Sequence, residues 1–180
     1  CVAQALQQRG YRVFATVRKK EDIEKLQAMG LESLQLDLDK SESIQTALKE
    51  ILGKTNGTLD ALFNNGAYGQ AGALEDLSRD VLRQQFETNV LGWHELTSLV
   101  LPVMLKQGHG RIIQNSSVLG FVALKFRGAY CASKYAIEGL TDTLRQELSG
   151  TNIYISLIEP GPIESQFRAN AFAAYKRNVH

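Results

Sequence analysis

The 180 residues are enough for one domain, or at most a tight pair, with a sizeable core. Hydrophobic residues make up 44% of the chain and charged residues 22%, which indicates a globular protein and excludes a disordered one. Lys and Arg number 20 against 19 Asp and Glu, so the net charge of +1 argues against binding to nucleic acid or to a membrane surface. The most apolar stretch, 96–105, is interrupted by polar residues and Pro, and is too short to span a membrane.

Cysteine use favours a reducing compartment. Cys1 and Cys131 are too few for a disulfide scaffold, and we therefore expect a cytoplasmic protein. Cys131 is expected to be a packed core thiol. The three histidines show no metal-ligand spacing with one another or with cysteine, and no metal site is expected.

The predicted elements alternate between helix and strand along the chain. Apolar residues at helical spacing predict helices over 1–9, 21–29, 41–52, 78–106 and 129–148, the fourth capped by Ser78. Short apolar runs predict strands over 11–17, 34–38, 59–63, 111–116 and 153–158. Runs of this kind, without polar alternation, are typical of strands buried on both faces. The sequence therefore predicts a doubly wound, parallel, Rossmann-like α/β fold in a single domain, 1–180, with no predicted element after Pro160-Gly161-Pro162.

Tyr130 and Lys134 are the first candidates for chemistry. Four residues apart on a predicted helix, they share one face. A phenol is a poor base at neutral pH, but a nearby ammonium group stabilises the phenolate and lowers the phenol pKa. The pair is therefore suited to general acid/base work, although by itself this spacing is more often a surface pair.

Other polar or Gly-rich segments end on the same predicted edge. Ser117 closes one strand, Asn64-Asn65-Gly66-Ala67 closes another, and Pro160-Gly161 follows the last. In an open α/β sheet, ligands bind outside the carboxyl ends of the strands. We therefore expect these segments to meet the start of the Tyr130 helix at one site.

These motifs resemble the short-chain dehydrogenase/reductase family, over 2–168. Ser117, Tyr130 and Lys134 match its Ser and Tyr-x-x-x-Lys motif, and Asn89-Val90-Leu91-Gly92 matches Asn-Val-x-Gly. Asn64-Asn65-Gly66-Ala67 is similar to Asn-Asn-Ala-Gly with the last two residues exchanged, Asp37-Leu38 matches the adenine site, and Pro160-Gly161 is followed by Ser165 in the Thr position. The sequence is similar to bacterial NADP-dependent, aldehyde-reductase-like members near the retinol and 17β-hydroxysteroid dehydrogenase branch.

The resemblance implies roles for these residues. Tyr130 would exchange a proton with the substrate oxygen, Ser117 would hydrogen-bond that oxygen, and Lys134 would lower the Tyr130 pKa and bind the nicotinamide ribose. Asn89 would hold a water of a proton relay, and the hydride comes from the cofactor. The implied cofactor contacts are Asp37, Leu38, Asn64, Gly66, Tyr130, Lys134, Pro160, Gly161, Ile163 and Ser165.

Arg18 and Lys19 decide the expected cofactor. A carboxylate directly after the strand predicted over 11–17 would bind the ribose 2′-OH of NAD. The run Arg18-Lys19-Lys20 found there suits a 2′-phosphate instead and predicts NADP. The alternative is a solvated helix entry. The Gly-rich turn of the family, which would bind the pyrophosphate, is not in the sequence. We expect that turn and its strand to precede Cys1, and a further substrate segment to follow the C-terminal end.

Phe121, Leu124 and Phe126 lie between Ser117 and Tyr130. They either line an apolar substrate pocket, which would suit a hydrophobic aldehyde, ketone or alcohol, or pack on the domain or a subunit contact. The apolar helices 78–106 and 129–148, with the resemblance, favour a homo-dimer or homo-tetramer. Two alternatives to an NADP-dependent reductase remain open: an epimerase or dehydratase on the same fold, and a non-catalytic nucleotide-sensing module.

Overall fold

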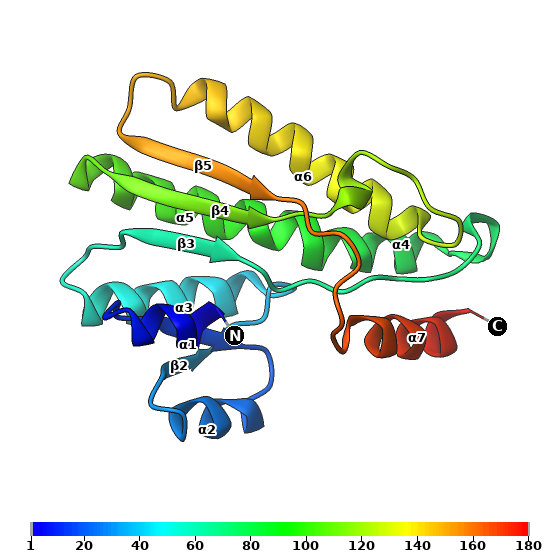
Figure 1. The fold of residues 1–180 in the computed structure, drawn as a ribbon, viewed down its shortest axis with the longest axis horizontal. Helices are drawn as coiled ribbons and strands as arrows, with labels where there is room; N and C mark the ends of the chain where they lie inside the picture. The colour runs from blue at the N-terminus through cyan, green and yellow to red at the C-terminus, as the bar shows by residue number, and fades with distance from the viewer. Residues whose placement is uncertain (1, 180) are drawn as a thin grey trace.

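The computed structural model describes residues 2–179, so the expectations for Cys1 and His180 lie outside the described residues. Figure 1 shows the fold. The helices are α1 (Val2–Gln8), α2 (Glu21–Gln27), α3 (Ser41–Lys54), α4 (Arg79–Phe86), α5 (Gly92–Gln107), α6 (Gly128–Glu147) and α7 (Phe167–Asn178). The strands are β1 (Phe14–Val17), β2 (Glu32–Gln35), β3 (Ala61–Asn64), β4 (Gly110–Asn115) and β5 (Ile153–Ile158). Short helical turns are η1 (Leu74–Asp76), η2 (Glu87–Leu91), which is a π-helical turn, and η3 (Val118–Gly120).

All strand pairs are parallel, and the Rossmann-like α/β class is confirmed. β1 pairs with β2, and β3, β4 and β5 pair in that order. The expected single sheet is divided, because no described strand hydrogen-bonds to both β1–β2 and β3–β4–β5. The strand predicted over 34–38 is observed as β2, which ends at Gln35. Asp37 and Leu38 therefore lie in the connection that leads to α3.

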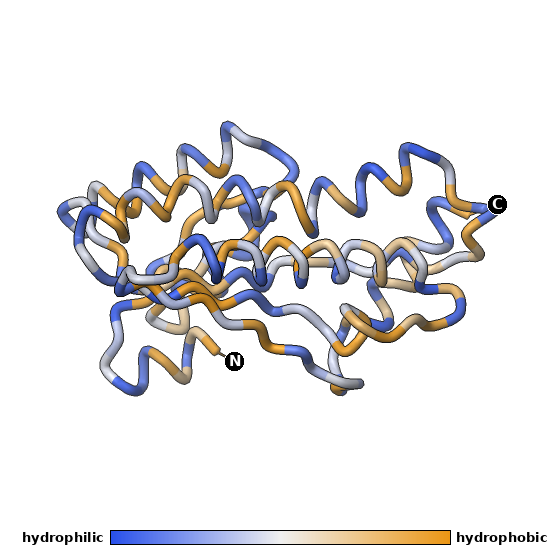
Figure 2. The backbone as a smooth tube through the Cα atoms, turned by 90° about the horizontal axis from the view of Figure 1, so that it is seen from above, coloured by the Kyte–Doolittle hydropathy of each residue, from blue (hydrophilic) through white to orange (hydrophobic). Residues whose placement is uncertain are grey.

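Helix α3 joins the two sheets. Its Ile44 and Leu48 pack in the main core, with α5 and the three-stranded sheet. Its Ala47 and Ile51 pack in a second cluster, against Leu34 of β2. In Figure 2 the apolar strands run through the middle of the molecule, between helices. The core thus links the sheets through side chains where backbone pairing is absent.

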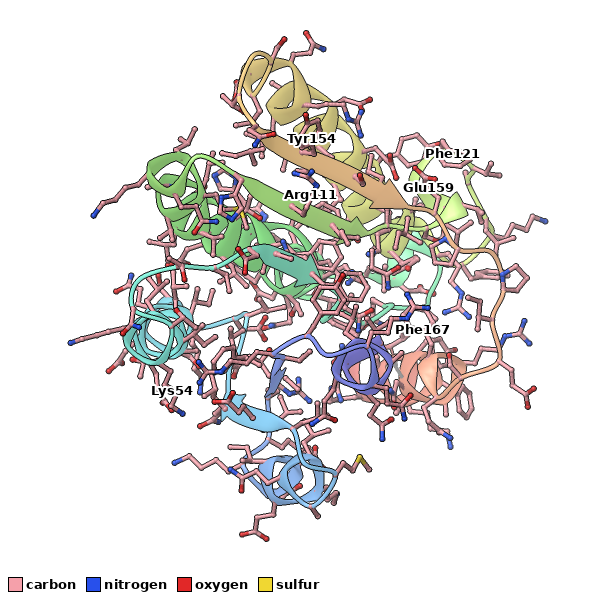
Figure 3. All side chains as sticks on the ribbon, turned by 60° about the vertical axis from the view of Figure 1, so that its left-hand side comes forward. Lys54, Arg111, Phe121, Tyr154, Glu159 and Phe167 are labelled. Carbon is pink, nitrogen blue, oxygen red and sulfur yellow. The ribbon has the colours of Figure 1, made fainter. Side chains whose placement is uncertain are left out.

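The three-stranded sheet is covered on one face. Ile153 and Ile155 of β5 are buried in the main core with residues of α3 and α5, whereas Tyr154 and Ile158 are exposed. On the exposed face the Arg111 guanidinium lies 4.2 Å from the centroid of the Tyr154 ring (Figure 3). The expectation of burial on both faces is therefore wrong for β5, because the described helices that contact it, α5 and α6, share one core.

Two features of the helices differ from the sequence prediction. The predicted helix over 78–106 begins as expected, since the Ser78 hydroxyl accepts a hydrogen bond from the Val81 backbone, but the π-helical turn η2 divides it into α4 and α5. The C-terminal segment forms α7, for which we predicted no element. α7 buries only the small side chains of Ala171 and Ala174, and such a narrow apolar stripe gives little periodic signal.

Candidate active site

The carboxyl ends of β3, β4 and β5 come together as predicted. The Asn115 side chain at the end of β4 donates a hydrogen bond to Asn65 Oδ1 after β3, at 2.7 Å. Beyond β4, the Val118 backbone donates to the carbonyl oxygen of Pro160, at 3.2 Å. Figure 3 places Phe121 and Glu159 beside this same edge, toward which the strand arrows point. Parallel pairing puts these three loops side by side, and α6 begins next to them.

Tyr130 lies in the first turn of α6, with 8% of its surface exposed. Burial raises the pKa of the Tyr130 phenol, and a hydrogen bond with the Ser117 side chain acts in the opposite direction. The Ser117 hydroxyl also accepts a hydrogen bond from the Leu119 backbone at 3.1 Å, which orients it at the start of η3. The predicted Ser and Tyr therefore lie close enough for Ser117 to affect the Tyr130 pKa. A lowered Tyr130 pKa is not seen here, because burial has the larger effect.

Lys134 lies one turn further along α6 and is buried, with 1% of its surface exposed. Its Nζ atom donates to the Asn115 carbonyl oxygen at 2.7 Å and lies 5.6 Å from the centroid of the Tyr130 ring. Burial lowers the pKa of Lys134 to about 7, and the Glu138 carboxylate acts against this. The shared face predicted for Tyr130 and Lys134 is confirmed, and Lys134 titrates near neutral pH.

Glu138 continues the same face of α6 by another turn. Its carboxylate accepts a hydrogen bond from the Ser116 hydroxyl. Burial raises the pKa of Glu138; Ser116 and Lys134 lower it, and the charges of Glu159 and Asp142 raise it further. We did not single out Glu138 from the sequence, although its spacing from Lys134 is the helical i, i+4 spacing that marked Tyr130.

Asn89 is buried in the π-helical turn. Its side chain accepts from the Tyr68 backbone N–H at 3.1 Å and donates to the Tyr68 carbonyl oxygen at 2.9 Å. It also donates to Ser133 Oγ at 3.1 Å, and Ser133 Oγ donates to the Tyr130 carbonyl oxygen at 2.8 Å. Asn89 thus reaches the Tyr130 backbone through Ser133, which the sequence analysis missed. Its role in a water relay stays a prediction.

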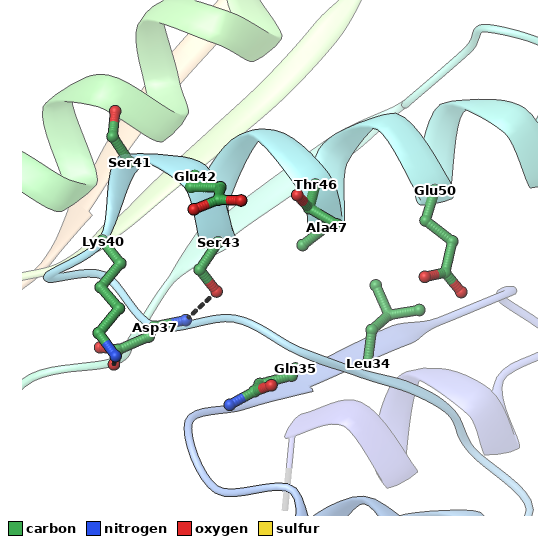
Figure 4. Close-up of a pocket in the computed structure, with 10 residues that line it drawn as sticks. All are labelled: Leu34, Gln35, Asp37, Lys40, Ser41, Glu42, Ser43, Thr46, Ala47 and Glu50. Atoms are coloured by element: carbon green, nitrogen blue, oxygen red, sulfur yellow. Dashed lines mark hydrogen bonds and ion pairs between the residues drawn. The ribbon is translucent and has the colours of Figure 1, made fainter.

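The predicted contacts near the adenine are distributed over two places. Asn64 is buried, and its amide donates to Thr97 and Gln114. Leu38 packs closely on Gly66, where an added Cβ atom would lie 3.0 Å from Leu38 Cδ1. Asp37 lines a separate cavity of about 530 Å³ between β2 and α3, and its backbone N–H donates to Ser43 (Figure 4).

The predicted 2′-phosphate residues lie on the surface. Arg18 and Lys19 directly follow β1 and are exposed, and Lys19 forms a 3.2 Å ion pair with Glu21. The backbone of Arg18 is fixed by Gln35 of the neighbouring strand, whose amide donates to the Arg18 carbonyl oxygen at 2.9 Å. This hydrogen bond holds the Arg18 backbone in place at the end of β1, while the side chain is exposed.

The loop after β5 is largely exposed. Gly161, Ile163 and Ser165 are exposed, whereas Pro160 is half-buried and tied to the loop after β4. Ser165 Oγ accepts a hydrogen bond from the Phe167 backbone at 3.3 Å, at the start of α7. Figure 1 shows α7 on the side to which the strand arrows point.

A cavity of about 550 Å³ adjoins the start of α6. Its lining combines small and apolar residues with one cation: Gly72, Ala73, Leu74, Ala123, Leu124, Lys125, Phe126, Gly128 and Cys131. Leu124 and Phe126 thus lie where the sequence analysis placed a substrate pocket. Phe121 does not line the cavity and is 56% exposed. Cys131 is a buried free thiol, as expected.

Phe167 at the start of α7 covers Tyr130. The two ring centroids lie 5.3 Å apart with an angle of 60° between the planes. Gly69 leaves room for this contact, since an added Cβ atom would lie 2.8 Å from Phe167 Cζ. Phe167 was not predicted as a site residue, because the segment that carries it was predicted to have no fold of its own.

Within residues 2–179 no cluster of His, Cys, Asp and Glu is arranged to hold a metal ion. Over the same residues, no helix combines the length and the apolar character that crossing a membrane requires.

Parallel strands joined by helices, with Ser117, Tyr130 and a buried Lys near their carboxyl ends, define a Rossmann-like α/β protein. The family model for short chain dehydrogenase matches residues 1–176, and the chain belongs to this family. Members of this family bind a nicotinamide cofactor.

Individual relatives agree with this assignment. The chain is 44% identical over 165 residues to the uncharacterized oxidoreductase YbbO of Escherichia coli K12, covering 92% of the chain and 61% of the relative. It is 39% identical over 170 residues to human retinol dehydrogenase 8, covering 91% and 53%. The crystal structure of F189W actinorhodin polyketide ketoreductase with NADPH matches with a TM-score of 0.87 and 28% identity, over 97% of this chain and 70% of that one. The chain spans little more than half the length of these curated relatives.

Proposed function

We propose that the protein is an NADP-dependent reductase of hydrophobic aldehydes or ketones, working also as an alcohol dehydrogenase in the reverse direction. One observation carries this proposal: the Tyr130 phenol lies close enough to the Ser117 hydroxyl for that group to lower its pKa, near the buried Lys134 and at the start of the helix that an apolar cavity adjoins. A proton donor, an oxyanion donor and a cation at one edge of the sheet suit proton exchange at a carbonyl oxygen.

The chain's own residues perform the proton and charge steps. In reduction, the Tyr130 hydroxyl donates its proton to the substrate oxygen, and the Ser117 hydroxyl hydrogen-bonds the same oxygen as negative charge develops there. Lys134, held by Asn115, supplies positive charge near the phenol and stabilises the phenolate left after proton transfer. The cofactor, when bound, supplies the hydride.

The donor set fits the nicotinamide end of such a cofactor. The Lys134 ammonium would bind ribose hydroxyls, and Pro160, Gly161, Ile163 and Ser165 border the same edge after β5. At the other end, Arg18 follows β1 on the surface and would bind a 2′-phosphate bidentately, with Lys19 beside it. Asp37 and Leu38 would face the adenine. The ketoreductase structure holds NADPH and another solved neighbour holds NAD, so this preference rests on Arg18 and Lys19.

The lining of the cavity of about 550 Å³ supports an apolar substrate. Leu74, Leu124 and Phe126 offer apolar surface, and Lys125 is the single charged residue of the lining. Burying apolar substrate atoms against these side chains is favourable, whereas a strongly charged substrate would lose solvation without a partner.

A kinetic comparison of two tyrosines on α6 tests the proposed function. We expect Tyr130→Phe in the full-length protein to abolish NADPH oxidation with hydrophobic aldehydes, a loss of about 10²–10⁴-fold or more, while NADPH still binds. Tyr135→Phe is the matched control, because Tyr135 is exposed on the same helix. Turnover retained in Tyr130→Phe would refute the assignment of the proton donor.

We also propose a cytoplasmic homo-dimer or homo-tetramer. Exposed apolar side chains on α5 and α6, namely Leu105 and Leu140, support pairing of these helices with a second copy. Sedimentation velocity of the full-length protein tests this, and a monomer at micromolar concentration would contradict it.

A further inference from the structure

Trp93 is the tryptophan of this sequence, and its surface is fully buried in the first turn of α5. Its ring lies under the Lys134 side chain, with Nζ 4.3 Å from the ring centroid. A cation within about 6 Å of an aromatic centroid is attracted by the ring, and tryptophan gives the strongest attraction of the aromatic side chains. The proton and charge steps proposed for Tyr130, Ser117 and Lys134 do not involve this contact.

The indole of Trp93 is fixed from two sides. Its Nε1 donates a hydrogen bond to the Gly66 carbonyl oxygen at 2.7 Å, after β3. Its ring packs in an apolar cluster with Val90 of η2 and Ile137 of α6. Trp93 therefore holds the ring plane steady and also ties the Gly66 loop to α5.

Because Lys134 is buried, its contact with the Trp93 ring affects the stability of its charged form. Water is excluded from the ammonium, so its charge depends on the protein groups that face it. These groups are the Asn115 carbonyl from β4, the Trp93 ring from α5, and Tyr130 and the Glu138 carboxylate from α6. Nζ donates to the Asn115 carbonyl oxygen, and it lies nearer to the centroid of the Trp93 ring than to that of the Tyr130 ring.

We propose that Trp93 is a positioning residue for Lys134, whose indole face orients the ammonium beside Tyr130 and stabilises its charged form. Its effect on turnover rests on the proposed function, whereas the contact itself does not. The π face acts on Lys134, and the indole N–H acts on the Gly66 loop, so that two substitutions separate them. Trp93→Phe keeps a π face and removes the N–H, and Trp93→Leu removes both.

The pH dependence of kcat is the first measurement, made on the full-length protein with NADPH and a hydrophobic aldehyde. We expect kcat to fall on a limb of the profile where Lys134 loses its charge with rising pH, and Trp93→Leu to move this limb to lower pH by roughly one unit. Trp93→Phe should keep the limb near its original place and mainly raise KM for NADPH, through the Gly66 loop. Val100→Ala, which removes buried volume from the same helix, is the control for packing and should leave the limb unmoved.

Equal profiles in all three variants would overturn the proposal and leave Trp93 as packing alone. A shift in Val100→Ala as large as that in Trp93→Leu would overturn it as well, because a loosened helix would then explain both.

The emission of Trp93 gives a second measurement that needs neither turnover nor a folded Trp93→Leu variant. The difference in fluorescence between the native protein and Trp93→Phe isolates this one indole. We expect it to change with pH in a single titration as Lys134 loses its charge, and to stop changing in Lys134→Met. A titration that persists in Lys134→Met, or none in the native protein, overturns the proposal. If no substrate is turned over while the titration is present, the proposed function fails and the contact stands.

Discussion

Gly92 allows α5 to lie against the connection after β2. A Cβ atom at this position would lie well inside contact distance of the Leu38 carbonyl oxygen and 2.8 Å from Leu38 Cβ. The obstacle is largely backbone, which no change of rotamer relieves, so Gly92→Ala forces α5 and the Leu38 segment apart. Overpacking of this kind costs about 1–3 kcal/mol. For a chain of this length, 2 kcal/mol corresponds to a drop in Tm of roughly 4–8 °C.

Gly139→Ala is the matched control for this prediction. Gly139 lies inside helix α6 with nothing within 4 Å of an added Cβ atom. Alanine is the better helix former there, by about 0.5–1 kcal/mol, and we expect this variant to be at least as stable as the native protein. The assay is thermal and urea unfolding of both variants. Equal Tm values for Gly92→Ala and Gly139→Ala would refute the reasoning, because the contact with Leu38 would then have no effect on stability.

Three further predictions concern the site. Arg18→Ala should raise KM for NADPH about tenfold or more and leave KM for NADH nearly unchanged; equal changes in steady-state kinetics with both cofactors would remove the argument for NADP. Because burial lowers the pKa of Lys134 from 10.5 to about 7, the unfolded chain binds more protons than the native state between these pH values. The free energy of unfolding from this group therefore rises with pH across that window, and urea titrations of Lys134→Met should show a flatter rise; parallel curves would contradict this. Leu124→Ala, on the cavity wall, should raise KM for long apolar aldehydes several-fold more than for acetaldehyde, and an equal effect on both would place the substrate elsewhere.

The sequence predicted the part of the site that depends on strand ends and helical spacing. Ser117 follows a strand, and Tyr130 and Lys134 share a helix face, so pattern alone placed them together. The other contacts of Lys134 could not be found in this way. Its partners Asn115 and Trp93 come from other elements, and only the packing of α5 and α6 on the sheet brings them to it.

The electrostatic prediction failed for a related reason. The spacing of Tyr130 and Lys134 predicted that the cation would lower the phenol pKa, but spacing carries no information about burial. In the structure, burial raises the Tyr130 pKa and lowers the Lys134 pKa, and both effects arise from the elements packed around α6. Phe167 was missed because its helix contacts Tyr130 through one ring at its first residue, and the apolar stripe of that helix is too narrow to give a periodic signal.

The π-helical turn at Glu87–Leu91 makes the site sensitive to the loss of a single residue. A turn of this kind holds one residue more than the α-helix around it. Deleting one residue there would close the wide turn into regular α-helix, so that α4 and α5 could keep their faces while the residues of the turn itself would point in new directions. Asn89 would then no longer face Ser133. We therefore expect related chains to differ in sequence across this segment but to keep its length.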